Sequence, residues 1–221
     1  MNKDIILGID AGTSLIKAVA FTIHGKELGS SSIPNEYKIE PKGKATQSLE
    51  LTWNKFCEVI KKLKEQFNDL ENRIHLISVT GQGDGTWLID ENGEPVCDAW
   101  LWLDSRSSEI AKKLSTLDAE ENRFVATGTG MFSGNQSSQL LFMEKNHPEI
   151  LDKAKTAFHC KDWIYYKLTG IKATDPSESC FTFGNFRTQE YDDNVINGLG
   201  LSKRRNLLPQ IINGTKTHHS L

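Results

Sequence analysis

A short stretch near the N-terminus combines the residue types that can hold a metal-bound phosphate. Asp10 supplies a carboxylate, Thr13 a hydroxyl and Lys17 a cation, with Gly12 and Ser14 between them. A glycine here lets a bulky anion approach the main-chain N–H groups. A carboxylate, a hydroxyl, N–H groups and a cation together suit a phosphate that carries Mg²⁺. An ordinary hairpin whose Asp10 and Thr13 only cap the turn would show the same pattern.

A second glycine-rich stretch, residues 81–85, directly follows an apolar run that predicts a buried strand. Ligands of open α/β sheets bind beside such strand ends. Gln82 and Asp84, on either side of Gly83, could hydrogen-bond vicinal hydroxyls, because a carboxylate accepts and an amide both donates and accepts. The alternative is a glycine-rich turn with solvated polar side chains.

Trp102, Asp104 and Arg106 lie where a strand is expected to pass into a helix. As the wall of a pocket, they would offer an aromatic face to the apolar edge of a sugar and a charged rim to its hydroxyls. Taken alone they fit the alternative better, which is an indole in the core and a capping carboxylate that pairs with Arg106 on the helix surface.

The hydrophobic pattern predicts the elements that position these residues. Short apolar runs bounded by turn residues predict strands, and three- and four-residue spacing of apolar residues predicts a helix at residues 53–67. In this half, strands are expected at residues 5–7, 18–21, 28–33 and 73–80, and a loop with edge-strand character at 34–48. Residues 86–90 and 96–101 should form a hairpin, since the pair Asn92–Gly93 lies between them.

A further helix is expected to open at residues 102–106, with Asp104 or Ser105 as its cap, and to run to Leu117. From Arg123 onward the pattern is mostly helical. We expect a glycine-rich loop at residues 127–134, helices near 140–143, at 150–154 and at 162–168, a strand at 157–160 and a looser chain beyond 175. Because no Pro- or Ser-rich linker divides the chain, one domain with a helical insertion is expected.

Composition excludes several classes of protein. The chain has 221 residues and a formal net charge of -3, which argues against a nucleic-acid partner, since that would require a basic stripe. No apolar run is long enough to cross a bilayer, and the N-terminus leads into a strand rather than a signal peptide, so the cytoplasm is the expected location. Sequence templates for P-loops, Rossmann folds, nucleophile elbows and C-x-x-C sites are missing.

Together these stretches resemble the carbohydrate kinases of the FGGY family. The matching segments keep the family's order and spacing across nearly the whole chain, at residues 8–17, 80–84, 102–106, 127–128, 161–170 and 174–177. Each segment is weak, but the ordered set is specific. The resemblance implies an α/β domain with an actin-like, ribonuclease-H-like fold, in which helices flank a mixed central sheet and a helical insertion is added.

The resemblance also implies ATP and Mg²⁺ as cofactors. In the family, the Asp10 position helps to hold Mg²⁺, the Thr13 position lies near the transferred phosphate and the Lys17 position faces the phosphates. Gly12 and Ser14 complete this ATP-binding segment. The hairpin is therefore expected to bind the phosphates of ATP.

For the substrate, the resemblance implies a sugar pocket. Its expected lining is Gln82, Gly83, Asp84, Trp102, Asp104 and Arg106. Glycerol kinases carry Arg-Glu and xylulose kinases Met-His where this chain has Gly83-Asp84, which disfavours both glycerol and D-xylulose. The amino-acid sequence of residues 81–90 looks most like that of erythritol or L-xylulose kinases, so a small polyol or ketose is expected as the substrate.

Members of the family are about twice as long as this chain, a difference of one whole domain. Residues 1–221 are therefore expected to be the N-terminal sugar-binding domain of a two-domain kinase, without its C-terminal ATP-binding domain. The resemblance puts the general-base Asp beyond Leu221, so the chain alone should hold no catalytic residue and be inactive. A homodimer is compatible with the resemblance. A non-catalytic sugar-binding module and an actin-type ATPase are the alternative functions.

Overall fold

The structure, a computed structural model, describes residues 3–117 and 119–220 and divides the chain into two compact units. The first unit comprises the residues up to Tyr37 together with Ser48–Gln82. The second comprises Lys38–Gln47 and the residues from Gly83 onward. The chain passes between the units at residues 37–38, 47–48 and 82–83, and no change of composition marks these crossings. The structure thus divides the chain into two units, each built from two segments, where the sequence predicted one domain with a helical insertion.

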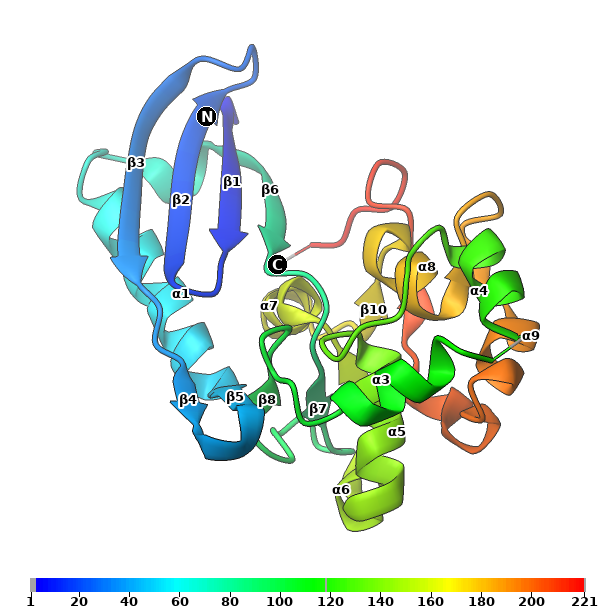
Figure 1. Ribbon diagram of the computed structural model, residues 1–221. Coiled ribbons are helices and arrows are strands. Elements are labelled where there is room, and N and C mark those ends of the chain that lie inside the picture. Colours follow the sequence, from blue (N-terminus) through cyan, green and yellow to red (C-terminus); the bar gives the residue numbers. More distant parts are fainter. Residues whose placement is uncertain (1–2, 118, 221) are drawn as a thin grey trace. The chain divides into compact units, whose positions relative to one another are not determined.

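The first unit is a four-stranded mixed sheet with a long helix against it (Figure 1). Its elements are β1 (Ile5–Ala11), β2 (Leu15–Thr22), β3 (Glu27–Pro34), α1 (Leu49–Lys64), α2 (Leu70–Arg73) and β6 (Ile74–Gly81). The strand order is β3-β2-β1-β6, in which only β1 and β6 are parallel. The strands and helix that the sequence predicts for this part of the chain are confirmed.

Alternation along β1 and β2 explains why this sheet forms. The buried side chains are Ile5, Leu7, Ile9, Ala11, Ile16, Ala18 and Ala20. They occupy every second position, so one face of each strand lies on the core. Asp10 and Lys17 stand at the alternate positions and are exposed. The pattern that builds the sheet therefore also presents these two charges to solvent.

Helix α1 contacts β2 and β3 through an apolar stripe that includes Phe56, Val59 and Leu63. The helix begins after Ser48, whose hydroxyl accepts the N–H of Leu51 at 3.2 Å. Lysines in the last turn suit the negative end of the helix dipole. Both the Ser48 cap and the packing of its apolar stripe therefore stabilise helix α1.

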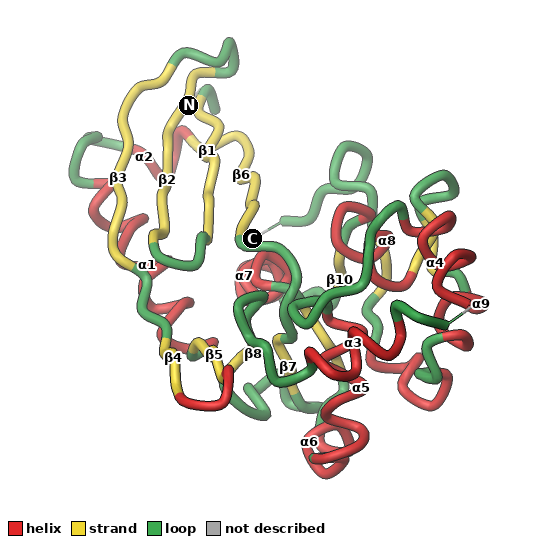
Figure 2. Tube along the Cα trace, in the orientation of Figure 1, coloured by secondary structure: helices red, strands yellow, loops and turns green. Residues whose placement is uncertain are grey.

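The second unit contains short strands and most of the helices (Figure 2). Its strands are β4 (Lys38–Glu40), β5 (Lys44–Gln47), β7 (Trp87–Ile89), β8 (Ala99–Trp100), β9 (Thr156–Phe158), β10 (Ala173–Thr174), β11 (Gly184–Asn185), β12 (Glu190–Tyr191) and β13 (Gln210–Ile211). Its α-helices are α3 (Ser108–Leu114), α4 (Ala119–Thr127), α5 (Gln136–Asn146), α6 (Pro148–Lys153), α7 (Cys160–Thr169), α8 (Pro176–Phe183) and α9 (Asp193–Gly198). Residues 41–43 and 202–207 form 3-10 helices.

Among the described residues, four small sheets and an apolar cluster organise the second unit. The sheets are β4-β5-β8, β7-β9, β10-β13 and β11-β12, and only β10 and β13 pair in parallel. The cluster joins Leu88 of β7, Trp100 of β8, Leu140 of α5 and Phe183 of α8. It therefore fixes the segments that follow Asp84 and the two helices whose side chains reach that residue.

Two expectations for this unit are wrong and a third is incomplete. The helix predicted to open at residues 102–106 begins at Ser108, and the Asp104 carboxylate accepts the N–H groups of Ala45 and Arg106 instead of capping that helix. Residues 34–48, expected as a loop with edge-strand character, contain β4 at the edge of its sheet and also β5, which pairs with both β4 and β8. The chain beyond Asp175 is not loose but contains α8 and α9. Each begins after an aspartate, Asp175 or Asp192, whose carboxylate accepts an N–H of the first turn.

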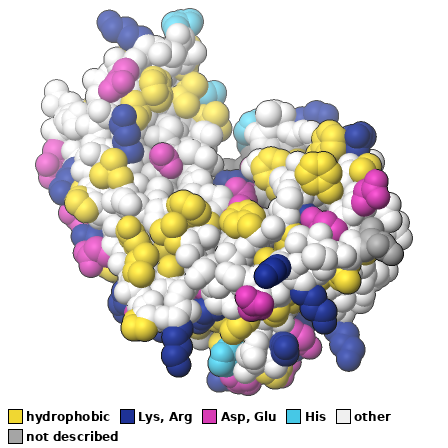
Figure 3. Space-filling model, in the orientation of Figure 1, with side chains coloured by type: hydrophobic (Ala, Val, Ile, Leu, Met, Phe, Trp, Pro, Cys, Tyr) yellow, Lys and Arg dark blue, Asp and Glu magenta, His cyan; other side chains and the backbone are white. Residues whose placement is uncertain are grey.

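No helix within residues 3–117 and 119–220 is long and apolar enough to span a membrane. On the face shown in Figure 3, Lys and Arg side chains are interspersed with those of Asp and Glu. This distribution matches the small net charge and differs from the basic stripe of a nucleic-acid-binding protein.

Replacing Leu63 by Ala should lower the free energy of unfolding by about 3 kcal/mol, because the side chain is fully buried under the sheet and its loss leaves a cavity. Urea denaturation followed by circular dichroism measures this. Lys61→Ala, on the exposed face of the same helix, is the control and should leave the value almost unchanged. Equal effects of the two substitutions would contradict the packing of α1.

Candidate functional site

The first unit places the predicted phosphate-binding residues on one hairpin, residues 10–17, which we call the phosphate hairpin. Asp10 and Lys17 pair across β1 and β2, and both are exposed. Within the described part of the chain, no hydrogen bond or ion pair involves either charged group. A carboxylate and an ammonium group thus lie side by side and remain available to a ligand.

Gly12 and Asn35 shape the turn of the phosphate hairpin. A Cβ on Gly12 would lie 2.9 Å from the carbonyl oxygen of Leu15, so the turn requires glycine. Asn35 donates its side-chain amide to the Gly12 carbonyl at 2.9 Å and its backbone N–H to the Ser14 carbonyl at 2.9 Å. It is buried, and its Oδ1 has no hydrogen-bond partner among the described residues. Sequence reasoning missed Asn35, which fixes the carbonyl side of the turn.

Gln82, predicted to line the sugar pocket, lies in the first unit and contacts the phosphate hairpin. Its backbone N–H donates to the Ala11 carbonyl at 3.1 Å, and its Oε1 accepts the hydroxyl hydrogen of Thr13 at 3.0 Å. The parallel pairing of β1 and β6 explains this proximity, because both strands end at the same edge of the sheet. Thr13 and Gln82 are therefore joined, although 69 residues separate them in sequence.

The phosphate hairpin fits ATP and Mg²⁺ only as part of a site. Among the described residues, no group of three or more His, Cys, Asp or Glu side chains is placed to hold a metal ion. Mg²⁺ is commonly held by one or two carboxylates with water and substrate phosphates as its other ligands. Asp10 offers one exposed carboxylate and Lys17 one exposed cation. These groups suit a magnesium-bound phosphate rather than a bare ion.

Asp84 is the central residue of the candidate sugar site in the second unit. It has a left-handed backbone, with φ 54°, between two glycines. Its Oδ1 accepts the side-chain amide of Asn135 at 2.9 Å, and its backbone N–H donates to Oε2 of Glu178 at 3.1 Å. A left-handed conformation is uncommon for residues other than glycine, although aspartate tolerates it better than most. Contacts from the start of α5 and from α8 therefore hold Asp84.

Burial raises the pKa of the Asp84 carboxyl. The hydrogen bond from Asn135 and the positive charge of His159 oppose this increase, and the negative charge of Glu178 adds to it. Hydrogen bonds to a carboxylate favour its ionised form. The Asp84 carboxylate would therefore gain from further donors, and the hydroxyls of a polyol are such donors.

The backbone of Trp102 and of Gly134 lies against the Asp84 loop, residues 83–85. The N–H of Gly85 donates to the carbonyl of Gly134 at 2.9 Å. A Cβ on Gly134 would overlap the carbonyl oxygen of Trp102 and lie 2.5 Å from the ring of Phe132. Trp102 is 44% exposed and Phe132 42%, so the indole does not lie in the core. Two segments that carry half-exposed aromatic side chains thus approach the loop through their backbone.

Asp104 and Arg106 bond to each other. Asp104 is fully buried. Its Oδ2 accepts the Ala45 N–H at 2.8 Å and the Arg106 guanidinium at 2.7 Å. The guanidinium carbon lies 3.2 Å from the centroid of the Trp100 ring. The pair ties the segment before α3, which also carries Trp102, to β5 and β8.

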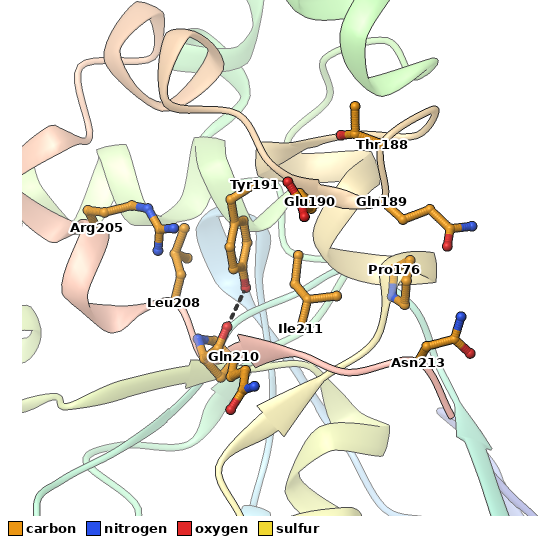
Figure 4. Close-up of a pocket in the computed structure, with 11 residues that line it drawn as sticks. Pro176, Thr188, Gln189, Glu190, Tyr191, Arg205, Leu208, Gln210, Ile211 and Asn213 are labelled. Carbon is orange, nitrogen blue, oxygen red and sulfur yellow. Dashed lines mark hydrogen bonds between the residues drawn. The ribbon is translucent and has the colours of Figure 1, made fainter. Parts of the chain in front are cut away.

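A separate pocket of about 570 Å³ in the second unit contains none of the predicted site residues (Figure 4). Tyr191 donates its hydroxyl hydrogen to the Pro209 carbonyl at 2.9 Å, and the Arg205 guanidinium lies 4.5 Å from the Tyr191 ring. Its main polar side chains are thus engaged within the protein, and we assign no ligand to this pocket.

Comparisons of this chain with a family model and with individual proteins agree on one family. Residues 5–221 match the model of the N-terminal domain of the FGGY family of carbohydrate kinases. The chain is 50% identical, over 99% of its length, to the erythritol kinase of Brucella abortus (strain 2308). It is 26% identical, over 93% of its length, to the L-xylulose/3-keto-L-gulonate kinase of Escherichia coli (strain K12). It spans 42% of the length of each of these relatives.

A solved structure shows the same fold. The "xyloylose kinase from Brucella ovis" superposes with a TM-score of 0.88 at 22% sequence identity, and the match covers 97% of this chain and 44% of that one. At this identity the likeness establishes the fold alone. The expected α/β class, actin-like and ribonuclease-H-like with a mixed sheet and helices, is confirmed.

Removing the guanidinium by Arg106→Met should lower the free energy of unfolding by about 3 kcal/mol, because it leaves the buried Asp104 carboxylate without its cation. Urea denaturation measures the loss. The control is Arg73→Met, which removes a similar bidentate partner from the half-exposed Asp4 and should change stability little. A larger effect at Arg73 than at Arg106 would contradict the role given to the buried pair.

Proposed function

Because the chain belongs to the FGGY family of carbohydrate kinases, we propose that the protein containing it transfers the γ-phosphoryl group of ATP to a hydroxyl of a small polyol or ketose. Erythritol is the favoured substrate and L-xylulose the next. The observation that carries this proposal is the 50% identity to an erythritol kinase over 99% of the chain, against 26% to an L-xylulose kinase.

The phosphate hairpin would bind the nucleotide. When bound, ATP supplies the phosphoryl group and Mg²⁺ offsets its negative charge. Asp10 would hold the metal through water, and Lys17 would face the phosphate oxygens. Gly12 leaves the backbone of the turn open to those oxygens, while Asn35 keeps the turn in shape. The exposed, unpaired charges of Asp10 and Lys17 in the described structure support these roles.

The polyol would bind at the Asp84 loop. Asp84 would accept hydrogen bonds from its hydroxyls, and Trp102 would cover its carbon chain. Gly83 would act indirectly, because its missing side chain lets the Glu178 carboxylate pack against the loop. Asp104 and Arg106 would act indirectly, since they hold the segment that carries Trp102. Gln82 would contribute through Thr13, which it contacts.

Two further parts of the proposal concern the whole protein. The carboxylate that accepts the proton of the attacking hydroxyl is expected outside this chain, and a second domain would supply most of the nucleotide site. The 221-residue chain alone would then bind the polyol weakly and phosphorylate it negligibly. A cytoplasmic location is proposed because ATP is the phosphoryl donor.

A panel of acceptors tests the function. With the complete kinase, kcat/KM for erythritol should exceed that for glycerol and D-xylulose by at least about tenfold. A site that hydrogen-bonds the hydroxyls of one substrate rejects analogues that leave its polar groups unpaired. A coupled assay of ADP release gives these values. Asp10→Ala is the control and should lower kcat about a hundredfold, since the carboxylate proposed to hold the magnesium ion beside the phosphates would be lost. Absence of phosphorylation with every polyol and ketose would refute the proposal.

Polyol affinity should depend on pH through Asp84. Its carboxyl has a pKa raised above the usual 3.8, so protonation, and with it the loss of an acceptor oxygen, begins at a higher pH than for an exposed aspartate. Affinity should therefore fall as pH decreases through this raised pKa. Isothermal calorimetry with erythritol between about pH 4 and 8 measures the change.

Two variants distinguish protonation of Asp84 from unfolding of the protein at low pH. Asp84→Asn should bind erythritol more weakly and lose the pH dependence. Asp90→Asn, in a turn where the carboxylate accepts the N–H groups of Asn92 and Glu94, should keep it. An unchanged pH profile in Asp84→Asn would contradict the assignment of Asp84.

A further inference from the structure

Glu178 contacts the Asp84 loop in two ways. Its Oε2 accepts the Asp84 N–H at 3.1 Å. Its Oε1 lies against Gly83, where an added Cβ would come within 2.9 Å of it. The carboxylate therefore packs onto the Gly83–Asp84 peptide, an approach that a side chain at position 83 would obstruct. The Glu178 side chain is only 14% exposed.

His159 stands on the other side of the Glu178 carboxylate. Its Nε2 lies 3.8 Å from Glu178 Oε2, and its Nδ1 lies 3.3 Å from Asp162 Oδ2. Burial lowers the pKa of His159, but the charges of Glu178 and Asp162 raise it by more, so the pKa is raised overall. Lys161, 3.2 Å from Asp162 Oδ1, adds a second cation. Glu178 is thus held between a buried imidazole and the loop.

The two contacts on Asp84 are complementary. Asn135 holds one carboxylate oxygen, and its own Oδ1 accepts the Phe132 N–H at 2.8 Å. Glu178 holds the main chain of the same residue. A left-handed residue with a Cβ costs free energy and persists only where its surroundings fix it. Without Glu178 the peptide could return to negative φ, which would turn the carboxylate away.

We propose that Glu178 is a positioning residue of the sugar site, which holds the Gly83–Asp84 peptide so that the Asp84 carboxylate faces the hydroxyls of a polyol. This inference rests on the proposed function, since it takes Asp84 as the polyol ligand. Glu178 itself touches the loop and not the substrate. Its removal should therefore weaken polyol binding and leave nucleotide binding intact.

Steady-state kinetics of the complete kinase test the proposal. Glu178→Leu should raise KM for erythritol about tenfold or more, the order expected for a lost hydrogen bond to a charged group. KM for ATP should stay within about threefold. Glu178→Gln should remain near wild type, because its amide oxygen accepts the same N–H. Gly83→Ala, whose methyl group would displace the carboxylate, should reproduce the leucine variant even if that variant folds poorly.

A structural effect alone is distinguished by a matched control and a second readout. Glu144→Leu removes a carboxylate of the same unit that bonds Arg204 at 2.7 Å and should leave KM for erythritol unchanged. Hydrogen exchange of the Asp84 amide should be at least about tenfold faster in Glu178→Leu and unchanged in Glu178→Gln.

Unchanged KM for erythritol in both Glu178→Leu and Gly83→Ala, with an active wild-type enzyme, would overturn the inference. So would an equal rise of KM in Glu178→Leu and Glu144→Leu, or an Asp84 amide that exchanges at the wild-type rate in Glu178→Leu. A wild-type enzyme that phosphorylates no polyol would instead overturn the proposed function, while the exchange rates would still decide whether Glu178 holds the loop.

Discussion

A single residue held in an uncommon backbone conformation organises the second unit's candidate site. Asp84 is left-handed, and this conformation persists because Asn135 binds its carboxylate and Glu178 its N–H. Asn135 directly precedes α5 and Glu178 lies on α8, and the apolar core fixes these helices through Leu140 and Phe183. Gly83 and Gly85 cannot easily carry a side chain, because Glu178 packs against the first and the Trp100 carbonyl against the second. Core packing thus determines where one carboxylate points.

Each unit supplies a different kind of chemistry. The first unit exposes a carboxylate and an ammonium group on one hairpin, which suits a phosphate with its metal. The second presents a partly buried carboxylate, which suits the hydroxyl donors of an uncharged polyol. A kinase requires both kinds of site. The chain belongs to the FGGY family of carbohydrate kinases, with which the proposal of both sites is consistent.

The sequence allowed much of the first unit to be predicted and less of the second. Strands β1, β2 and β6 and helix α1 follow from local alternation and periodicity, which need no knowledge of distant residues. Asn135 and Glu178 could not be found in this way, because they lie 51 and 94 residues from Asp84 in sequence. For the same reason the buried bond from Ala45 to Asp104, 59 residues apart, overturned the expected helix cap. The caps of α8 and α9 are local signals, so those helices were within reach of sequence reasoning.

Binding of erythritol at the Asp84 loop can be measured by titrating it into the isotopically labelled 221-residue chain and following amide and indole chemical shifts, because NMR detects weak binding. The amides of Asp84, Gly85 and Asn135 and the indole N–H of Trp102 should shift together with one dissociation constant. Signals of the pocket around Tyr191 and Arg205 should stay in place. Shifts confined to that pocket, or none at Asp84 and Trp102 at saturating erythritol, would contradict the assignment of the Asp84 loop as the polyol site.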